Sequence, residues 1–419
     1  MKKILIIDDC PTVLKAFETK IVMLNRGIEI LSATSYAKAN EIIRQNRDSI
    51  YAAIVDLNLP DCKSGNAALL TNSHKIPTIV FTNVEDDSLK SLLSKKDILD
   101  YIKKDSPESI QYAVNFITRI IRNNETTAII VDDSELSRKT FRADLEKLRI
   151  NVVEACDSKE ALELINNNEL NISLVLIDYY MPNMDGVELT KILRKKYEKD
   201  SLSIIAISGT DDETILTKFI KAGANDYLSK PYKFEELNVR IHSNLDILEL
   251  FKKTKDLANK DFLTGAYNRR YFFNVSPNII KTNLKNGTEI ALITLDIDYF
   301  KKINDKYGHA IGDKALKHVI AILNQTIKVP NIVTRFGGEE FCILIEDISY
   351  EDSKSLSEEI RVNFENSEIK IDKHIVKYTV SMGIAHGKID DIDLALKASD
   401  NALYEAKDNG RNQVIAREV

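Results

Sequence analysis

The sequence has few of the residues that disulfide or zinc frameworks need. Its four cysteines, at positions 10, 62, 156 and 342, lie far apart and form no CxxC pair, and its six histidines form no cluster with ligand spacing. Neither a disulfide framework nor a zinc site is therefore expected. Long polar tracts are also missing, and hydrophobic residues make up 44% of the chain, so we expect an ordered globular protein.

Long apolar runs and an excess of positive charge are absent too. The first apolar run covers only Ile4 to Ile7, which is too short for a signal peptide or a membrane span. A net charge of −6 argues against nucleic-acid binding but leaves room for small phosphorylated ligands, because a few local cations can hold them. We expect a cytoplasmic protein with no membrane and no nucleic-acid partner.

The 419 residues exceed what one hydrophobic core usually organises, and the first part of the chain contains an internal repeat. Four apolar runs that end in polar side chains occur in residues 1–123 and again, in the same order, in 124–243. The polar residues are paired aspartates, a single aspartate, a hydroxyl residue and a lysine: Asp8, Asp9, Asp56, Thr82 and Lys104, then Asp132, Asp133, Asp178, Ser208 and Lys230. Amphipathic stretches with helical spacing separate the runs, which predicts two doubly wound, flavodoxin-like α/β domains.

Ligands in such sheets bind beyond the carboxyl ends of the strands, so each set of polar residues is expected to converge on one pocket. Three carboxylates in one pocket repel each other, which invites a hard cation such as Mg²⁺. One carboxylate can then attack a phosphoryl group, because the cation and the lysine neutralise the charge. The hydroxyl side chain can hydrogen-bond the new phosphate.

These features resemble the receiver domains of response regulators over nearly all of residues 1–243. The resemblance implies Asp56 and Asp178 as phosphoacceptors, and Mg²⁺ in both domains beside the paired aspartates. It makes the hydroxyl residues and the lysines partners of the phosphate, and a histidine kinase or phosphotransfer protein the donor. Tyr101 and Tyr227 occupy the position of the switch aromatic residue.

The second copy matches the receiver family more closely than the first. It has YMPNMDG after Asp178 and a proline at 231, whereas the first copy reads NLPDCKSG after Asp56 and has Asp105 in place of that proline. Neither departure removes a reacting group. A receiver fold that serves only as a docking module is the alternative for each copy.

A helix is predicted from Leu237 to Lys260, because this stretch is rich in helix formers and has neither glycine nor proline. Residues 244–260 would link the second domain to the third. Ile247, Leu250 and Leu257 have the spacing of a short coiled coil with a second copy, but three lysines interrupt one seam. A monomeric linker helix is the alternative.

The third domain, 261–419, carries four motifs in order: DFLTGAYNRR, ALITLDIDYFKKINDKYGHAIGD, RFGGEEF and NALYEAKDNGRNQV. Asp296 ends an apolar strand, and TRFGGEEFCILI predicts a hairpin with a Gly-Gly turn. Gly337 and Gly338 would let a nucleotide approach the backbone closely. Glu339 would then meet Asp296 across the sheet, and the two acids would share Mg²⁺.

Together the four motifs resemble the GGDEF family, the diguanylate cyclases. The resemblance implies a nucleotidyl-cyclase-like α/β fold with a mainly antiparallel sheet, and condensation of two GTP into cyclic di-GMP and two pyrophosphates. Its implied Mg²⁺ ligands are Asp296, Glu339 and the carbonyl of Ile297. Glu339 is also the implied proton acceptor, with Glu340 beside it. The other implied nucleotide contacts are Asn304, Asp313, His309, Gly337 and Gly338 near the base and backbone, and Lys301, Lys407 and Arg411 at the phosphates. Spaced by four on the terminal helix, the last two would face one ligand.

A product with two-fold symmetry implies a homodimer of catalytic domains, and the receivers imply that phosphorylation brings this dimer together. One motif departs from the family: the inhibitory RxxD site corresponds to KVPN here, with Lys328 and Asn331 at the key positions. Two rival hypotheses stay open. The domain could bind GTP or cyclic di-GMP without catalysis, or it could make a mixed purine dinucleotide, which the acid at 313 disfavours.

Overall fold

The computed structural model describes residues 2–24, 27–62, 65–83, 98–166, 170–209, 213–371 and 374–419. Packing divides the chain into two compact units, Met1–Lys252 and Lys253–Val419. Within the described ranges, no helix combines the length and the apolar composition that a membrane crossing needs.

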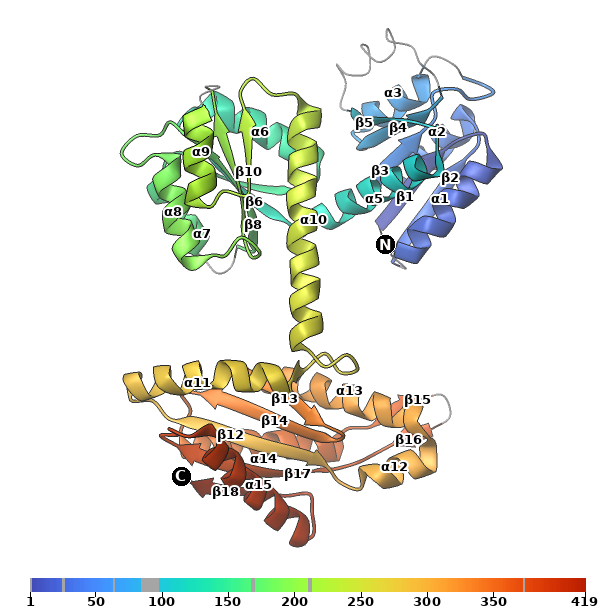
Figure 1. The fold of residues 1–419 in the computed structure, drawn as a ribbon. Coiled ribbons are helices and arrows are strands. Elements are labelled where there is room, and N and C mark those ends of the chain that lie inside the picture. The colour runs from blue at the N-terminus through green and yellow to red at the C-terminus, as the bar shows by residue number, and fades with distance from the viewer. Residues whose placement is uncertain are drawn as a thin grey trace. The chain divides into compact units, whose positions relative to one another are not determined.

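The first α/β domain is built on a five-stranded parallel sheet in the order β2-β1-β3-β4-β5. Its elements are β1 (Lys2–Ile7), α1 (Pro11–Leu24), β2 (Ile28–Ala33), α2 (Tyr36–Asn46), the 3-10 helix η1 (Arg47–Ser49), β3 (Ile50–Val55), α3 (Asn66–Ser73), β4 (Thr78–Thr82), β5 (Ile98–Lys103) and α5 (Pro107–Asn123). Because side chains alternate along β1, Ile4 and Ile6 pack with α1 and α5, while Leu5 and Ile7 pack with α2 and α3. Helices thus cover both faces (Figure 1), and polar residues begin where the strands end.

The second α/β domain repeats this strand order, because its sheet runs β7-β6-β8-β9-β10. Its elements are β6 (Thr127–Val131), α6 (Glu135–Lys147), β7 (Asn151–Ala155), α7 (Ser158–Asn166), β8 (Ile172–Asp178), α8 (Gly186–Lys196), β9 (Ser203–Ser208), α9 (Glu213–Ala222), β10 (Asp226–Ser229) and α10 (Phe234–Asn259). Ser134 and Asp185 begin α6 and α8, where their side chains accept hydrogen bonds from free N–H groups of the first turn. Both sheets therefore have the doubly wound order that the repeat predicts.

Helix α10 is one continuous helix that begins inside the second domain. Leu237, Ile241 and Leu245 are buried in the core that this domain forms with α5. Leu250 and Leu257 further along the helix are exposed. The first part of α10 therefore belongs to the domain core, and the predicted boundary at 243/244 falls within the helix.

The last helix of the first domain, α5, packs directly against α10. Arg119 in α5 forms ion pairs with Asp246 and Glu249 of α10, and Arg122 pairs with the same Glu249, with an N–O distance of 2.6 Å. Next to these ion pairs, the rings of Phe116 and His242 meet edge to face with centroids 4.7 Å apart. The two α/β domains thus share a hydrophobic core along α5 and α10.

Stability should fall in mild acid because of His242. Burial, together with the nearby Arg119 guanidinium, lowers the pKa of His242 from 6.5 to about 3. In the unfolded chain this histidine gains a proton below its ordinary pKa, whereas the folded protein keeps it neutral. Unfolding therefore becomes easier as the pH falls from 6.5 towards 3, by about 1.4 kcal/mol per pH unit at the most.

Calorimetry of the full chain near neutral pH and about one unit below pH 6.5 checks this expectation. His242→Gln should reduce the acid-induced drop of the melting transition that includes Met1–Lys252. His74→Gln, in the same unit but only partly buried, is the matched control and should leave the drop unchanged. An equal acid sensitivity in the wild type and in His242→Gln would contradict the assignment.

The second unit has a six-stranded sheet in the order β11-β13-β14-β12-β17-β18. Its elements are β11 (Tyr267–Asn268), α11 (Arg269–Asn286), β12 (Ile290–Ile297), α12 (Phe300–Tyr307), α13 (His309–Thr326), β13 (Asn331–Gly337), β14 (Glu340–Glu346), α14 (Tyr350–Asn366), β15 (Ile369–Ile371), β16 (His374–Val376), β17 (Val380–Gly387), α15 (Ile392–Asp408) and β18 (Val414–Glu418). Strand β12 pairs antiparallel with β14 and β17, and β13 pairs antiparallel with β14. The two outer pairs, β11 with β13 and β17 with β18, are parallel.

Both faces of the central strand β12 are buried. Ile293 and Leu295 point into a core with residues of α12, α13 and α14, whereas Ile290 and Leu292 point into a second core with residues of α11 and α15. This explains why β12 is apolar up to Asp296 apart from Thr294, which is buried as well. The carboxylate of Asp296 therefore lies near the C-terminal end of β12, beside the hairpin of β13 and β14.

Candidate functional site

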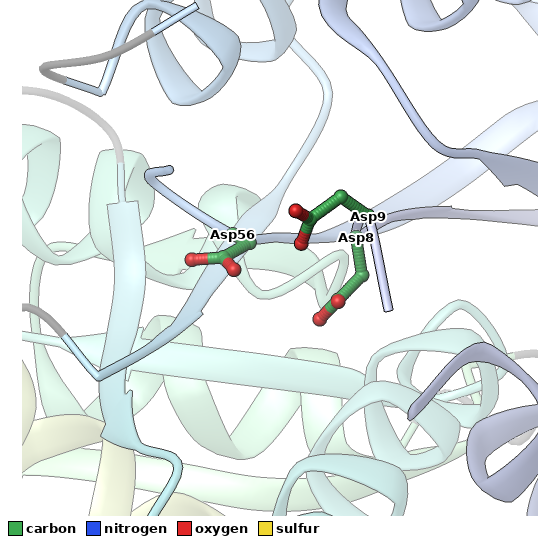
Figure 2. Close-up of side chains that lie close together, drawn as sticks. All are labelled: Asp8, Asp9 and Asp56. Carbon is green, nitrogen blue, oxygen red and sulfur yellow. The ribbon is translucent and has the colours of Figure 1, made fainter. Parts of the chain in front are cut away.

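In the first domain, the polar residues at the carboxyl ends of the strands meet at one point. Asp8 and Asp9 follow β1 and Asp56 follows β3, and Figure 2 shows their carboxyl groups together. Oxygens of all three lie within 4.8 Å of one another, which is true of no other group of three acidic, histidine or cysteine side chains in the described ranges. Lys104 donates hydrogen bonds to Asp8 and Asp56, both at 2.6 Å. Three carboxylates against one ammonium leave an excess of negative charge, which suits a hard divalent cation.

Burial dominates the electrostatics of this first cluster. Burial raises the pKa of Asp8 above its ordinary value, although the hydrogen bond from Lys104 acts in the opposite direction. Burial alone would lower the pKa of Lys104, but its hydrogen bonds to Asp56 and Asp8 raise it, so this ammonium stays charged. The backbone N–H of Cys10 donates to Asp8 at 2.9 Å and fixes its carboxylate.

The second domain builds a similar arrangement around Lys230. Its ammonium donates to Asp132 and to Asp178, both at 2.7 Å. Burial and the neighbouring Asp132 raise the pKa of Asp178, against the lowering effect of Lys230. Asp133 is exposed. The carboxylate oxygens of Asp132, Asp133 and Asp178 do not all lie within 4.8 Å of one another, which is the distance that unites Asp8, Asp9 and Asp56. Each lysine therefore contacts two of the three predicted acids, and the domains differ in the third: Asp9 lies with Asp8 and Asp56, whereas Asp133 does not join its pair.

The predicted switch residues stand next to these lysines. Thr82 and Ser208 end β4 and β9 and are fully buried. Their carbonyl oxygens accept hydrogen bonds from the backbone N–H groups of the two lysines, at 3.0 Å in the first domain and 2.7 Å in the second. Tyr101 and Tyr227 lie on the neighbouring strands β5 and β10 and are partly buried. Sequence reasoning missed Ser137, whose hydroxyl accepts a hydrogen bond from Lys230 at 3.2 Å.

In the second unit, Asp296 is the buried acid of the predicted catalytic set, with 5% of its surface exposed. The pKa of Asp296 is raised to about 6, mainly by burial. The charges of Glu339 and Glu340 also raise this pKa, whereas Lys407 acts in the opposite direction. The ammonium of Lys407 pairs with the Asp296 carboxylate at 2.8 Å. Ile297 follows as the last residue of β12 and is also buried.

The hairpin of β13 and β14 turns differently from the predicted Gly-Gly turn. Strand β13 ends at Gly337 and β14 begins at Glu340, so the two turn residues are Gly338 and Glu339. A register shift after Arg335 accounts for the difference. Gly338 has a φ of 52°, a left-handed conformation that favours glycine. Across the sheet it is Glu340 that faces Asp296, and Glu339 stands at the tip of the turn beside it.

A buried polar atom without a protein partner marks the next part of the site. The Oδ1 atom of Asn304, in α12, is buried and has no hydrogen-bond partner in the described part of the chain. Gly312 in α13 lies against it, since a Cβ atom at 312 would come within 1.9 Å of this oxygen. Asp313 and His309 are exposed on α13, and Lys301 is exposed on α12. An N–H donor of a ligand would satisfy the Asn304 oxygen.

The prediction that Lys407 and Arg411 share one helix is wrong. Helix α15 ends at Asp408, and Arg411 lies beyond it with a left-handed φ of 67°. The chain turns back here, because the backbone N–H of Arg411 donates to Ala406 at 3.0 Å. The guanidinium still lies near the lysine: it donates to the Lys407 carbonyl at 3.3 Å and stacks on Tyr299, with 4.5 Å to the ring centre.

Two further residues with structural roles lie at this site. Asp298 is buried and accepts hydrogen bonds from the hydroxyls of Thr379 and Ser381, at 2.6 and 2.7 Å, and from the backbone of Asn412. Its carboxylate is therefore committed to holding β12, β17 and the C-terminal segment together. Arg335 donates to the turn carbonyl of Gly338. Both residues stand inside the motifs, but the partners of Asp298 are remote in sequence.

Two family models match the chain. Residues 258–413 match the diguanylate cyclase GGDEF domain, and residues 128–242 match the response regulator receiver domain. These ranges place Asp296, Glu339 and Lys407 in the first match, and Asp132, Asp178 and Lys230 in the second.

Curated relatives include a response regulator and a diguanylate cyclase. Response regulator PleD of Caulobacter vibrioides is 29% identical over 300 residues, which are 69% of this chain and 65% of that protein. Diguanylate cyclase DgcM of Escherichia coli is 34% identical over 177 residues, 42% of each chain. The chain thus spans less than two thirds of the length of either relative.

Two solved structures of similar proteins cover 59% of this chain and the whole of their own chains. Each is described as a two-component system response regulator/GGDEF domain protein; they are 36% and 37% identical, with TM-scores of 0.54 and 0.53. Identity at this level over the complete length of those chains agrees with the two family matches. The chain therefore belongs to the response regulators that carry a GGDEF domain of the diguanylate cyclase family.

Proposed function

We propose that this protein is a phosphorylation-regulated diguanylate cyclase, which joins two GTP into cyclic di-GMP and releases two pyrophosphates. In this proposal residues 1–123 and 124–243 are tandem receivers, 244–260 link them to the catalytic domain, and 261–419 are that domain. The observation that carries the proposal is the buried Asp296 beside Glu339 and Glu340, next to a backbone turn that a nucleotide can approach.

The donor atoms at this site fit Mg²⁺. The carboxylates of Asp296 and Glu339 and the carbonyl of Ile297 are hard oxygen ligands, as this ion prefers. Burial and the neighbouring acids already raise the pKa of Asp296, and a divalent cation would offset that crowded negative charge. When bound, Mg²⁺ would stabilise negative charge on the nucleotide phosphates.

The other residues of the site divide the remaining tasks. Glu339 would accept the proton of the ribose 3′-hydroxyl that attacks the α-phosphate of the second GTP, with Glu340 beside it. Lys407, Lys301 and Arg411 would hold the phosphates, and the 2.8 Å pair between Lys407 and Asp296 keeps that ammonium at the reaction centre.

Base recognition would fall to residues of α12 and α13. The unpartnered oxygen of Asn304 can accept a hydrogen bond from guanine, and Asp313 can accept another from the N–H groups of the same edge. His309, the first residue of α13, would lie beside the same nucleotide. The acid at 313 favours guanine over adenine, because adenine lacks the adjacent N1 and N2 donors.

Each catalytic domain would hold one GTP, so the symmetric product requires two domains that face each other in a homodimer. We propose that phosphorylation of Asp178, and of Asp56, by a histidine kinase or phosphotransfer protein favours this dimer. Mg²⁺ would bind beside Asp8, Asp9 and Asp56, where the acids already cluster. In the second receiver it would bind beside Asp132, Asp133 and Asp178.

Incubation of the full chain with Mg²⁺ and GTP, then with ATP plus GTP, tests the proposed activity when the products are identified by mass. Cyclic di-GMP from GTP alone is the expected product. Nucleotide binding without any product would instead indicate a non-catalytic domain. A mixed dinucleotide as the main product would show that Asp313 does not select guanine.

Product inhibition should be weak or absent at the position of the family's inhibitory site. Lys328 stands there in place of arginine and lacks the planar fork that grips guanine and phosphate together. Asn331 replaces the acid, and its side chain donates to the carbonyl of Val329 at 2.7 Å. Initial rates with added cyclic di-GMP check this. Micromolar inhibition that Lys328→Ala abolishes would contradict the expectation.

A further inference from the structure

Arg335 joins two parts of the catalytic domain that are remote in sequence. Its Nε and Nη2 atoms donate to the carbonyl oxygen of Gly338, at 3.1 and 2.7 Å. Its Nη1 atom donates to the carboxylate of Asp261 at 2.9 Å. Both side chains of this ion pair are largely buried, with 13% and 17% of their surfaces exposed. One guanidinium thus uses its rigid fork on two acceptors at once.

Asp261 is a firm anchor for this contact. It lies two residues after the end of α10, and its carboxylate also accepts hydrogen bonds from the backbone and the hydroxyl of Thr264, at 3.0 and 2.7 Å. Its own backbone N–H donates to Ala266 at 2.8 Å. Partial burial alone would raise the pKa of Asp261, but the hydrogen bonds from Thr264 and Arg335 lower it, so the acid stays ionised.

The other acceptor is the peptide group that precedes Glu339. The carbonyl of Gly338 and the N–H of Glu339 belong to one planar peptide unit, so fixing this carbonyl also fixes the start of Glu339. Gly338 is in the left-handed region, where glycine has wide conformational freedom, and a two-residue turn has few hydrogen bonds of its own. Without an outside partner, this turn would sample several orientations.

We propose that Arg335 is a positioning residue, which holds the turn so that Glu339 stays beside Asp296, with Asp261 as its anchor. This inference rests on the proposed diguanylate cyclase activity. It also assigns a joint structural role to the DFLT and RFGGEEF motifs, because the first contributes Asp261 and the second contributes Arg335 to the ion pair. Asp261 lies just beyond the end of α10, so the orientation of the turn is tied to the point where the chain enters the catalytic domain.

A test should separate turn geometry from folding and from nucleotide binding. Arg335 lines an open hollow of about 460 Å³, together with Asn268, Arg269 and Arg270, so a shorter side chain leaves space that water can fill. Arg335→Gln should therefore fold. Its kcat should fall by about 10²-fold, the usual result of displacing a reacting group by about 1 Å, with KM for GTP within about threefold of the wild type.

Hydrogen exchange supplies a readout besides activity. In Arg335→Gln the amides of residues 337–340 should exchange faster, while those of the central strand β12 keep their protection. Asp261→Asn should lower kcat by a smaller factor. The double variant should be no slower than Arg335→Gln alone, because both substitutions act on one contact. Arg417→Gln is the matched control, since Arg417 pairs with Glu405 in the same domain outside the site.

The inference is overturned if Arg335→Gln keeps the wild-type kcat, if its loss lies in KM alone, or if exchange rises throughout the domain. Additive effects of the two substitutions would also overturn it, since Asp261 would then act independently. These results can be read only if the wild-type chain makes cyclic di-GMP. A wild type without any product overturns the proposed function instead, and exchange in residues 337–340 still reports on the turn.

Discussion

Replacing Asp296 by asparagine should reduce cyclic di-GMP synthesis by roughly 10³-fold, which corresponds to several kcal/mol of lost transition-state stabilisation. The asparagine cannot carry the negative charge that a divalent cation and Lys407 both require. Glu339→Gln should cause a loss of similar size, because the amide cannot accept the ribose proton. Initial rates of product formation at saturating Mg²⁺ and GTP measure both effects.

The Asp296 variant needs a folding control, because its carboxylate is buried and paired with Lys407 at 2.8 Å. Glu339 is only partly buried, so Glu339→Gln should keep the wild-type melting temperature and isolate the chemical effect. Glu359→Gln, at an exposed acid in α14, serves as the matched charge control and should retain full activity. Substantial synthesis by a folded Asp296→Asn or Glu339→Gln protein would end the enzymatic proposal.

Beryllofluoride, a mimic of the phosphoryl group, should activate the wild type by a factor between about 5 and 150, as expected for a coupling free energy of ordinary size. Asp178→Asn should abolish most of this activation, because the second α/β domain contributes the linker helix itself. Asp226 in β10, one residue before Tyr227, accepts hydrogen bonds from Arg240 and Asn244 of α10, at 2.7 and 3.1 Å. A change at Lys230 and β10 therefore reaches α10 through direct contacts.

Asp56→Asn is the matched comparison, since the ion pairs of the first domain with α10 come from α5, away from Asp56 in the chain. It should retain more of the activation than Asp178→Asn. Turnover and sedimentation velocity, each with and without beryllofluoride, measure catalysis and dimer formation together. If beryllofluoride changes neither turnover nor dimer formation in the wild type, phosphorylation does not regulate this protein. If activation depends on Asp56 alone, the first domain is the sensor.

Much of the fold follows from local sequence patterns. Apolar runs of strand length separated by amphipathic helices predict parallel doubly wound sheets, and the structure has two of them with one strand order. Polar residues gather at the carboxyl ends of parallel strands, and this rule predicts that Lys104 lies near Asp8 and Asp56. The structure has both contacts. The same rule does not set side-chain directions, which is why Asp133 points to solvent.

The details of the catalytic domain depend on contacts that spacing does not encode. A register shift after Arg335 moved the turn by one residue, so Glu340 rather than Glu339 faces Asp296. The helical spacing of Lys407 and Arg411 was misleading, because the chain leaves the helix after Asp408. The ion pair between Arg335 and Asp261 joins residues from two separate motifs, and only the folded chain reveals it.

Gly312 lies so close to Asn304 that position 312 has no room for a side chain. Even the single carbon of alanine at 312 would overlap the amide oxygen of Asn304, at 1.9 Å. That oxygen could then keep its place only if α12 and α13 moved apart. If Asn304 binds the base as proposed, selectivity for guanine would depend on the small volume of residue 312 as well as on the hydrogen-bonding groups.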